Sequence, residues 1–194
     1  PTILVNPIPD GQSEYTTPAL PIPDDTDFND YILVFPADSG VQPIYVYLKT
    51  ARDEPGTATG TGEILSGNGR WLDTASSGLG APIPSQVADK LRGRTFRDFA
   101  HFREQLWLTV SEYPELMLQF SKSNQFEILN GNAPFSIPSE QVGGRQRFEI
   151  HHIDFIRKGG KVYDMDNMRI NTVKNHLKHH SKNSEGSHGI ETTH

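Results

Sequence analysis

Two short stretches are the most informative about the fold: Phe148-Glu149-Ile150-His151-His152 and His176-Leu177-Lys178-His179-His180. The first predicts a strand, Gly159-Gly160 predicts a turn, and Met168-Arg169-Ile170 predicts a second short strand. A helix is expected from about Val173, and it carries the second stretch. The last third of the chain is therefore predicted to follow the order strand, loop, strand, helix.

Histidines are concentrated in this segment. Five of the eight in the chain lie here: His151, His152, His176, His179 and His180. Imidazole is the commonest metal ligand, whereas the absence of cysteine excludes disulfides and thiolate metal sites. His176 and His180 are four residues apart, so they share one helix face and can chelate one ion. His179 falls on a different face, where we expect it to be exposed to solvent.

The spacing argues against the common zinc proteases. A zincin needs Glu directly after the first helical histidine, but position 177 is Leu, and the inverted pattern fails because position 179 is His. A structural zinc site would need four closed ligands. Only three of these histidines are expected to converge, which leaves open positions for water or phosphate and favours a catalytic site.

The histidine doublet poses a geometric problem. Adjacent residues of a strand face opposite sides, so His151 and His152 should not both reach one site. We therefore predict a bulge or a bend at this doublet. A regular strand through both residues would count against their serving one site together.

The motifs of this segment resemble the HNH motif of the nuclease colicins and S-type pyocins. They are Gly143-Gly144-Arg145, Phe148 to His152, Gly159-Gly160, Tyr163-Asp164-Met165-Asp166-Asn167 and His176-x-x-x-His180. Four upstream segments resemble the opening of the same domain: Asp53 to Gly60, Trp71-Leu72, Gly80-Ala81-Pro82-Ile83-Pro84 and Ala88 to Arg92. The resemblance covers residues 52–182. It implies an α+β fold in which a mainly helical nuclease domain surrounds a ββα-metal motif.

The resemblance also implies a role for each residue. His152, Asn167 and His176 would be the named H, N and H, and His151, His176 and His180 would hold the metal. His152 would be the general base that activates water, with Asn167 holding its imidazole in the useful orientation. Three further residues match positions around the scissile phosphate: Arg52, Arg145 and Glu149.

The chemistry explains these residue types. A neutral histidine can take a proton from water at cellular pH. One divalent ion bound through three neutral imidazoles keeps its full charge, neutralises the phosphate and stabilises the leaving 3′ oxygen. The ligand set leaves Zn²⁺, Ni²⁺ and Mg²⁺ open as the ion.

The function implied is that of a bacteriocin cytotoxic domain, a metal-dependent, largely non-specific DNA endonuclease acting in a target bacterium. The alternative is a non-catalytic histidine/zinc module that binds nucleic acid without cutting it. An RNA-cutting toxin is a third hypothesis, which the HNH signature disfavours because sibling families use other folds for that task.

Partners are implied by the same resemblance. Besides double-stranded DNA, we expect a cognate immunity protein that docks on the segment from Ser123 to Phe135, with Arg103 from the neighbouring helix. The contact residues expected there are Asn124, Asn132 and Phe135, of which Phe135 would be an exposed apolar anchor. A buried Phe135 is the alternative. Receptor and translocation machinery would be engaged through domains upstream of this chain.

Composition and the family resemblance together divide the chain into three parts. Residues 1–51 contain an extended proline-punctuated segment and a predicted β-hairpin of Tyr31 to Phe35 and Ile44 to Leu48. This hairpin resembles the end of the pyocin translocation domain, so residues 1–51 would be the C-terminal end of such a domain. Residues 52–183 would be the endonuclease domain and residues 184–194 a flexible tail. The net charge of −6 is uneven: residues 1–51 hold seven acids and one base, residues 52–183 fifteen acids and seventeen bases. The nuclease part is thus mildly basic, which permits DNA binding.

Further elements within residues 52–183 are predicted from capping residues and spacing. The glycine-rich stretch from Asp53 to Gly69 is expected to be a linker that becomes a loop, and Ser85 is expected to cap a helix that ends at Gly93. Thr95-x-x-Asp98 predicts a capping box for a second helix. The apolar stripe of that helix is Phe99, Phe102, Leu106 and Val110. A further short helix is expected from Pro114 to about Ser121.

Localisation is inferred from two absences in the sequence. The chain shows no signal peptide, and no apolar run approaches the roughly 20 residues of a membrane helix. We expect release from the producing bacterium without a signal peptide and action in the cytoplasm of the target bacterium.

Overall fold

The computed structural model describes residues 4–7, 31–34, 44–46, 51–65 and 69–184. Side chains are described from residue 51 onward, except for those of residues 157 and 180–184. The chain divides into two compact units, Pro1–Ala51 and Arg52–His194, and each is considered by itself. No helix among the described residues is long and apolar enough to cross a membrane.

The first unit contains a three-stranded antiparallel sheet in the order β1-β2-β3. Its strands are β1 (Leu4–Pro7), β2 (Tyr31–Val34) and β3 (Ile44–Val46). The pairing of β2 with β3 confirms the predicted hairpin. The third strand, β1, was not predicted, because its short run ends in Pro7 and shows no alternation. As an edge strand it tolerates a proline at its end.

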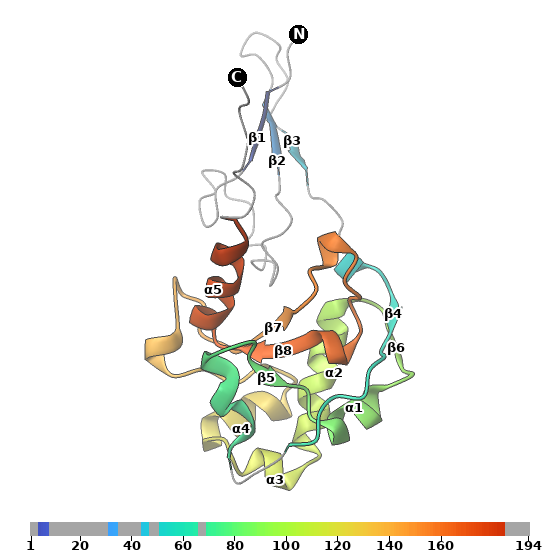
Figure 1. Ribbon diagram of the computed structural model, residues 1–194, viewed down its shortest axis with the longest axis vertical. Helices are drawn as coiled ribbons and strands as arrows, with labels where there is room; N and C mark the ends of the chain where they lie inside the picture. The colour runs from blue at the N-terminus through green and yellow to red at the C-terminus, as the bar shows by residue number, and fades with distance from the viewer. Residues whose placement is uncertain (1–3, 8–30, 35–43, 47–50, 66–68, 185–194) are drawn as a thin grey trace, which may run out of the picture. The chain divides into compact units, whose positions relative to one another are not determined.

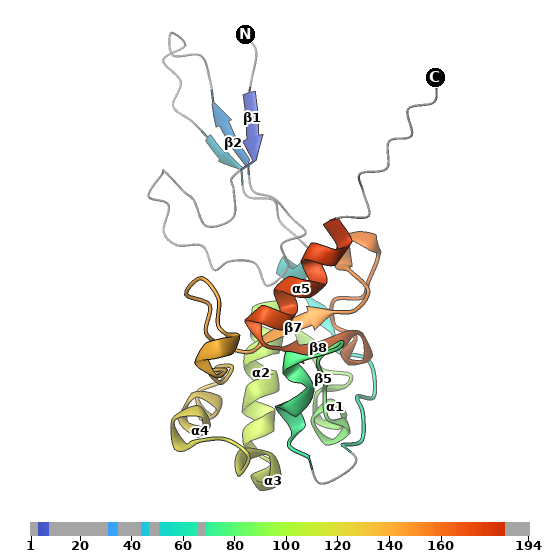
Figure 2. The same ribbon diagram turned by 60° about the vertical axis from the view of Figure 1, so that its left-hand side comes forward.

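The second unit is built around another three-stranded antiparallel sheet, in the order β5-β8-β7. Its strands are β5 (Ala81–Pro82), β8 (Met168–Asn171) and β7 (Glu149–His152). Helix α5 (Val173–Ser184) follows β8 directly. The predicted order strand, loop, strand, helix is therefore confirmed. In Figures 1 and 2, α5 lies on one side of this sheet and α2 (Phe99–Ser111) on the other.

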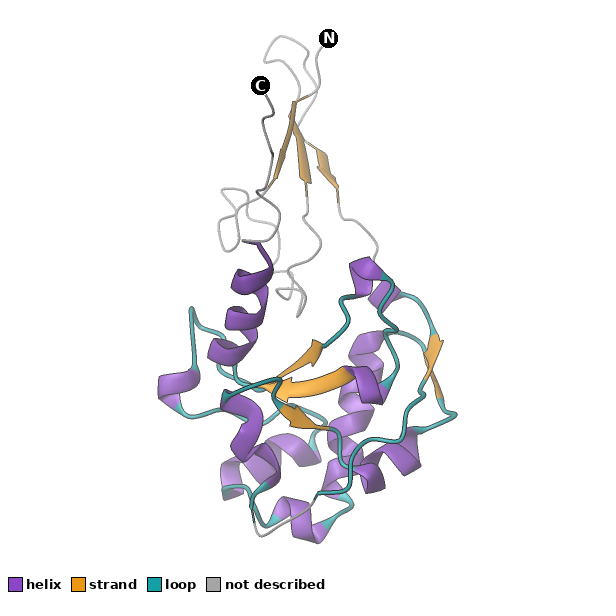
Figure 3. Ribbon diagram, in the orientation of Figure 1, coloured by secondary structure: helices purple, strands orange, loops and turns teal. Residues whose placement is uncertain are grey.

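The α-helices of this unit are drawn in purple in Figure 3. Besides α2 and α5 they are α1 (Ser85–Leu91), α3 (Pro114–Met117) and α4 (Lys122–Leu129). The predicted stripe of α2 is confirmed, since Phe99, Phe102, Leu106 and Val110 are all buried in the core. Trp71 and Trp107 are buried with them, 5.8 Å apart between ring centroids. The α+β fold expected from the sequence is confirmed.

Two predictions about the starts of helices need correction. Pro84, not Ser85, is the N-cap residue of α1, and no side chain bonds there. Thr95 forms no capping box, because Thr95–Phe96 is strand β6, paired with β4 (Gly56–Thr57). Asp98 alone caps α2, and its carboxylate accepts from the His101 N–H at 2.7 Å. Burial raises the pKa of Asp98, but this bond and the Arg97 guanidinium outweigh it, so that the pKa lies below its ordinary value.

Helix α4 was missed in the sequence because it buries only Ile128. A helix with a single buried side chain shows no apolar stripe. Its start is nevertheless well marked, because Ser121 accepts from the Asn124 N–H.

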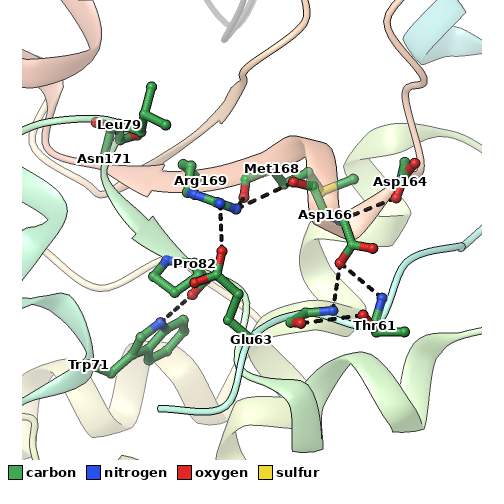
Figure 4. A network of polar contacts seen from close by, with 11 residues as sticks. Thr61, Glu63, Trp71, Leu79, Pro82, Asp164, Asp166, Met168, Arg169 and Asn171 are labelled. Atoms are coloured by element: carbon green, nitrogen blue, oxygen red, sulfur yellow. Dashed lines mark hydrogen bonds and ion pairs between the residues drawn. The ribbon is translucent and has the colours of Figure 1, made fainter. Parts of the chain in front are cut away.

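The glycine-rich stretch after Asp53 is not a linker. Residues 56–65, called the strap below, pair through Thr59 with Asp164, in the loop that precedes β8, and Ala58 is buried. Figure 4 shows how the strap is fastened: one carboxylate oxygen of Asp166 accepts from the N–H groups of Thr61 and Gly62, at 2.9 and 2.8 Å. Arg169 donates to Glu63 at 2.6 Å in the same network. Hydrogen bonds, which composition does not reveal, therefore order this stretch.

Candidate active site

Strand β7 divides the site into two faces. Its register with β8 is regular, pairing His151 with Arg169 and His152 with Met168. The predicted bulge at the histidine doublet is therefore wrong, and the first bend comes after the strand ends, at residues 153 and 154. Glu149 and His151 face α5, whereas Ile150 and His152 face the opposite side.

A series of hydrogen-bonded polar side chains lies on the face of β7 that is turned toward α5. Arg145 donates two hydrogen bonds to the Glu149 carboxylate, at 2.8 Å from Nε and 2.5 Å from Nη2. The same carboxylate lies 2.6 Å from Nδ1 of His176, which is 2% exposed. Since an ionised carboxylate only accepts, Nδ1 of His176 carries the proton. The lone pair of a neutral His176 is then on Nε2, which can act as a ligand.

His151 lies beside His176 on this face. Their ring centroids are 5.1 Å apart, and the ring planes cross at 70°. The ring of Phe155 contacts His151 edge-on at 5.9 Å. The ring of His179 lies against His151 at 4.7 Å and nearly parallel to it. The expectation that His179 is solvent-exposed is thus wrong, because its half-buried ring packs against the neighbouring imidazole.

These residues fit part of a divalent metal site. Two imidazoles on one tetrahedral ion, with Zn–N of about 2 Å, have ring centroids about 5 Å apart. The 5.1 Å between His151 and His176 agrees with that spacing, and the Glu149–His176 bond is the carboxylate–histidine pair that orients such ligands. Within the described side chains, no group of three His, Cys, Asp or Glu is placed to hold an ion. The third expected ligand, His180, lies in α5, but its side chain is outside the described set.

The opposite face of β7 carries His152. Its Nε2 lies 2.9 Å from the Val162 carbonyl oxygen, and the side chain is 2% exposed. A carbonyl only accepts, so Nε2 donates and Nδ1 is the basic nitrogen of the neutral ring. The Phe99 ring contacts His152 at 5.2 Å. The guanidinium carbon of Arg52 lies over the same Phe99 ring, 4.7 Å from its centroid.

Asn167 holds the backbone around His152. Its side-chain oxygen accepts from the Asp154 N–H at 2.7 Å, and its NH₂ donates to the carbonyls of Asp154 and Lys161 at 3.1 and 3.3 Å. The Lys161 carbonyl directly precedes the Val162 carbonyl that bonds His152. Asn167 therefore fixes the segment that orients the His152 ring.

Tyr163 anchors the same segment to the start of the domain. Its hydroxyl donates to the Glu54 carbonyl at 2.7 Å, and its ring packs against Gly56 so closely that a Cβ there would lie 2.1 Å from it. Burial, with the nearby charges of Asp98, Asp53 and Glu54, raises the pKa of Tyr163 to about 12. Tyr163 thus stays neutral over the range in which histidine chemistry operates.

The segment expected to bind a partner has a different surface from that predicted. Phe135 is half-buried under Arg147, whose guanidinium carbon lies 4.1 Å from the ring centroid. The Asn124 side chain bonds the backbone of Phe135: its oxygen accepts from the Phe135 N–H at 2.8 Å, and its NH₂ donates to the Phe135 carbonyl at 3.0 Å. Asn132 is exposed and donates to Glu127, and Arg103 is half-buried on α2.

The large exposed apolar side chains of this region were missed in the sequence. They are Phe126 and Leu129 of α4, which are 67% and 58% exposed. Had α4 been recognised as a helix, their spacing of three residues would have placed them on one outward face.

The chain is similar to known proteins in both sequence and structure. The family model for the colicin/pyocin-S2 DNase domain matches residues 56–182, and that for S-type pyocin matches residues 1–47. The chain is 51% identical to pyocin-S1 of Pseudomonas aeruginosa over 151 residues, 78% of this chain and 24% of that protein. It is 47% identical to colicin-E2 of Escherichia coli over 127 residues, 66% of this chain and 22% of that protein. The chain thus spans about a quarter of the length of these relatives.

Solved structures agree with the sequence comparison. The pyocin AP41 DNase–immunity complex matches with a TM-score of 0.63 and 45% identity, covering 66% of this chain and 99% of that chain. The mutant nuclease domain of pyocin S8 with its cognate immunity protein matches with a TM-score of 0.62 and 48% identity, covering 65% and 99%. The expectation of a bacteriocin DNase domain is confirmed at the level of the family. This chain belongs to the colicin/pyocin DNase domain family.

Proposed function

We propose that residues 52–183 are a metal-dependent endonuclease that hydrolyses double-stranded DNA largely without regard to sequence. Residues 1–51 would be the end of a translocation domain, and the whole would be the cytotoxic part of a bacteriocin. The observation that carries the proposal is the arrangement around β7: oriented imidazoles on the α5 face, and a buried His152 with a basic nitrogen on the other.

Metal binding would fall to His151, His176 and His180. When bound, a divalent ion supplies positive charge to the phosphate and stabilises the leaving 3′ oxygen. Glu149 fixes the tautomer and the ring plane of His176, and Arg145 fixes Glu149. The donor set suits Zn²⁺ or Ni²⁺, and Mg²⁺ is the abundant alternative in cells.

His152 would be the general base. Its Nε2–H is held by the Val162 carbonyl, so Nδ1 is the nitrogen that takes a proton from water. Asn167 would act as a positioning residue through the backbone that bears this carbonyl. Arg145 and Arg52 would add fixed positive charge beside the phosphate, Arg145 on the α5 face and Arg52 beyond Phe99 on the His152 side.

The regular pleat of β7 bears on how the two roles combine. It rules out a bulge that would turn both imidazoles to one side, the arrangement expected from the sequence. In an in-line displacement, however, the attacking water and the leaving oxygen lie on opposite sides of phosphorus. A base and a metal on opposite faces of one strand suit that geometry, with the phosphate at the end of β7, just past His152.

The partners would be DNA and an immunity protein. Support for the latter comes from the similar DNase domains of pyocins AP41 and S8, whose solved structures are complexes with immunity proteins. We place the docking surface on the segment from Ser123 to Phe135, with Arg103, Asn124, Asn132 and Phe135 as contacts. Phe126 and Leu129 add exposed apolar area to it. Action in the cytoplasm of a target bacterium would follow from delivery by upstream domains.

Cleavage of supercoiled plasmid tests this function. The purified chain, free of any partner, is incubated with Mg²⁺, Ni²⁺, Zn²⁺ or EDTA. We expect nicked and linear products with at least one metal and none with EDTA. A folded, metal-loaded chain that binds DNA but does not cut it with any of these metals would support the non-catalytic binding module instead.

A further inference from the structure

His179 is the one histidine between His151 and His180 to which the proposed reaction assigns no role. It lies in α5 between two expected metal ligands, and its ring is stacked on His151 with centroids 4.7 Å apart and planes 19° from parallel. Its Nε2 lies 2.8 Å from the carbonyl oxygen of Gly78. Since a carbonyl only accepts, the His179 Nε2–H is the donor.

The stacking geometry distinguishes His179 from a ligand. The lone pair of an imidazole nitrogen lies in the ring plane, so two rings can bind one ion only where their planes intersect near it. The planes of His151 and His176 cross at 70° and meet this condition. Those of His151 and His179 are nearly parallel, so their lone pairs do not converge on one point.

The contacts of His151 show what His179 can do. His176 and Phe155 meet the His151 ring at 70° and 82°, and these edge-on contacts limit movement within the ring plane. His179 covers a face of the ring. Rotation of the His151 ring about its bond to the chain would sweep that face into His179. The stacked ring therefore restricts the torsion that aims the His151 nitrogens.

Gly78 provides a fixed anchor for this stacked ring. Its φ of +53° is in the left-handed region that favours glycine, and its carbonyl also accepts from the Asn175 side chain at 3.2 Å. Asn175 is buried and bonds the Ala75 carbonyl and the Asn171 side chain as well. The turn that holds His179 is thus tied to α5 and β8, the elements that carry the site.

We propose that His179 is a positioning residue for His151: anchored on the Gly78 carbonyl, it stacks on the His151 ring and holds its plane in the orientation that binds a divalent ion. The inference rests on the proposed function in one respect, namely that His151 is a metal ligand. Outer contacts of this kind alter metal affinity by about 10- to 100-fold when they are removed.

Metal affinity of the full chain, without DNA, tests the proposal. Zn²⁺ and Ni²⁺ dissociation constants are measured by competition with a chromophoric chelator for the wild type and three variants. His179→Ala removes the stack and the anchor, His179→Gln keeps a donor but not the stack, and His179→Phe keeps the stack but not the anchor. We expect weakening of about 10- to 100-fold for Ala and Gln, and recovery of most of the affinity by Phe.

The control is Lys178→Ala, a change at the exposed neighbour on the same helix, which should leave the affinity unchanged. Circular dichroism of the metal-free variants shows whether each is folded. If His179→Ala disturbs the folding of α5, the comparison of His179→Phe with His179→Gln still tests the proposal. Only the Phe variant keeps a ring that can stack on His151, so a difference in metal affinity between these two folded variants reports on the stacking. Wild-type affinity in His179→Ala, or Phe as weak as Gln, would overturn the proposal. If all three His179 variants weakened metal binding equally, and His180→Ala left the metal affinity unchanged, His179 would be a metal ligand instead.

The proposal and the function on which it rests can fail separately. If the wild type binds metal but never cuts DNA, the endonuclease proposal fails while the affinity series still reports on His179. If His151→Ala binds metal as tightly as the wild type, the premise is wrong and so is the positioning role.

Discussion

Nδ1 of His176 lies 2.6 Å from a carboxylate oxygen of Glu149, a contact that joins α5 to β7 through two buried side chains. Arg145 bonds the same carboxylate, so the three form one chain of charge-assisted hydrogen bonds. This relationship ties the orientation of one expected metal ligand to a residue that is not itself a ligand. Its loss should therefore be visible in metal affinity.

Glu149→Gln should weaken Zn²⁺ or Ni²⁺ binding by about 10- to 100-fold, because a neutral amide no longer holds the His176 tautomer firmly. Isothermal titration of the full chain measures the effect. Glu140→Gln is the matched control, since Glu140 also contacts the start of α5, accepting from Thr172 at 2.8 Å, but is not bonded to His176. Equal affinity for Glu149→Gln and the wild type would contradict the orienting role.

Asn167→Ala should lower both stability and turnover. It removes three side-chain bonds to the backbone of Asp154 and Lys161, which should reduce the free energy of unfolding by about 1 to 3 kcal/mol. Because the loosened segment orients His152, kcat should fall by more than KM changes. Urea unfolding and plasmid-cleavage kinetics measure the two effects. Asn132→Ala, at an exposed position, should change neither, and an unaltered kcat in Asn167→Ala would argue against positioning.

The stability of the domain should fall at alkaline pH because of Tyr163. Its pKa is raised from 10.0 to about 12, so its neutral form is favoured in the folded state. The stabilisation is fully present below pH 10 and is lost as the pH rises through about 12, a change of about 2 to 3 kcal/mol. Chemical unfolding between pH 8 and 12 measures it. In Tyr163→Phe this loss should disappear, and a parallel decline in both proteins would contradict the assignment.

Opening of the strap should follow Asp166→Ala. This change removes the acceptor of the Thr61 and Gly62 N–H groups and should cost about 1 to 2 kcal/mol. Limited proteolysis should then cut within residues 56–65 faster than in the wild type. Glu115→Ala, at an exposed position of α3, provides the comparison. Unchanged cleavage of the strap would mean that its other contacts suffice.

The sequence predicted those features that depend on spacing. The stripe of α2 and the ββα order are periodic signals, and the candidate ligands follow from helical geometry together with the family motif. The elements that were missed lack such signals: β5 is two residues long, β1 ends in proline, and α4 buries one side chain. Their positions are set by tertiary contacts that a local pattern does not contain.

The errors at the site have a similar origin. A bulge was predicted at His151 and His152 because both were assumed to face one point, yet the regular strand allows each to work from its own face. His179 was assigned to solvent from its place on the helix, and its contact with His151 depends on the Gly78 turn, about a hundred residues earlier in the chain. Such long-range contacts follow from the fold and not from the motif.

One pair of variants separates the metal-binding role of the α5 face of β7 from the general-base role of its opposite face. Metal affinity and plasmid cleavage are measured on the same preparations of His151→Ala and His152→Ala. We expect His152→Ala to bind metal like the wild type without cleaving DNA, and His151→Ala to lose metal affinity and cleavage together. Full cleavage by His152→Ala, or loss of metal binding in it, would show that the two faces of β7 do not have these separate roles.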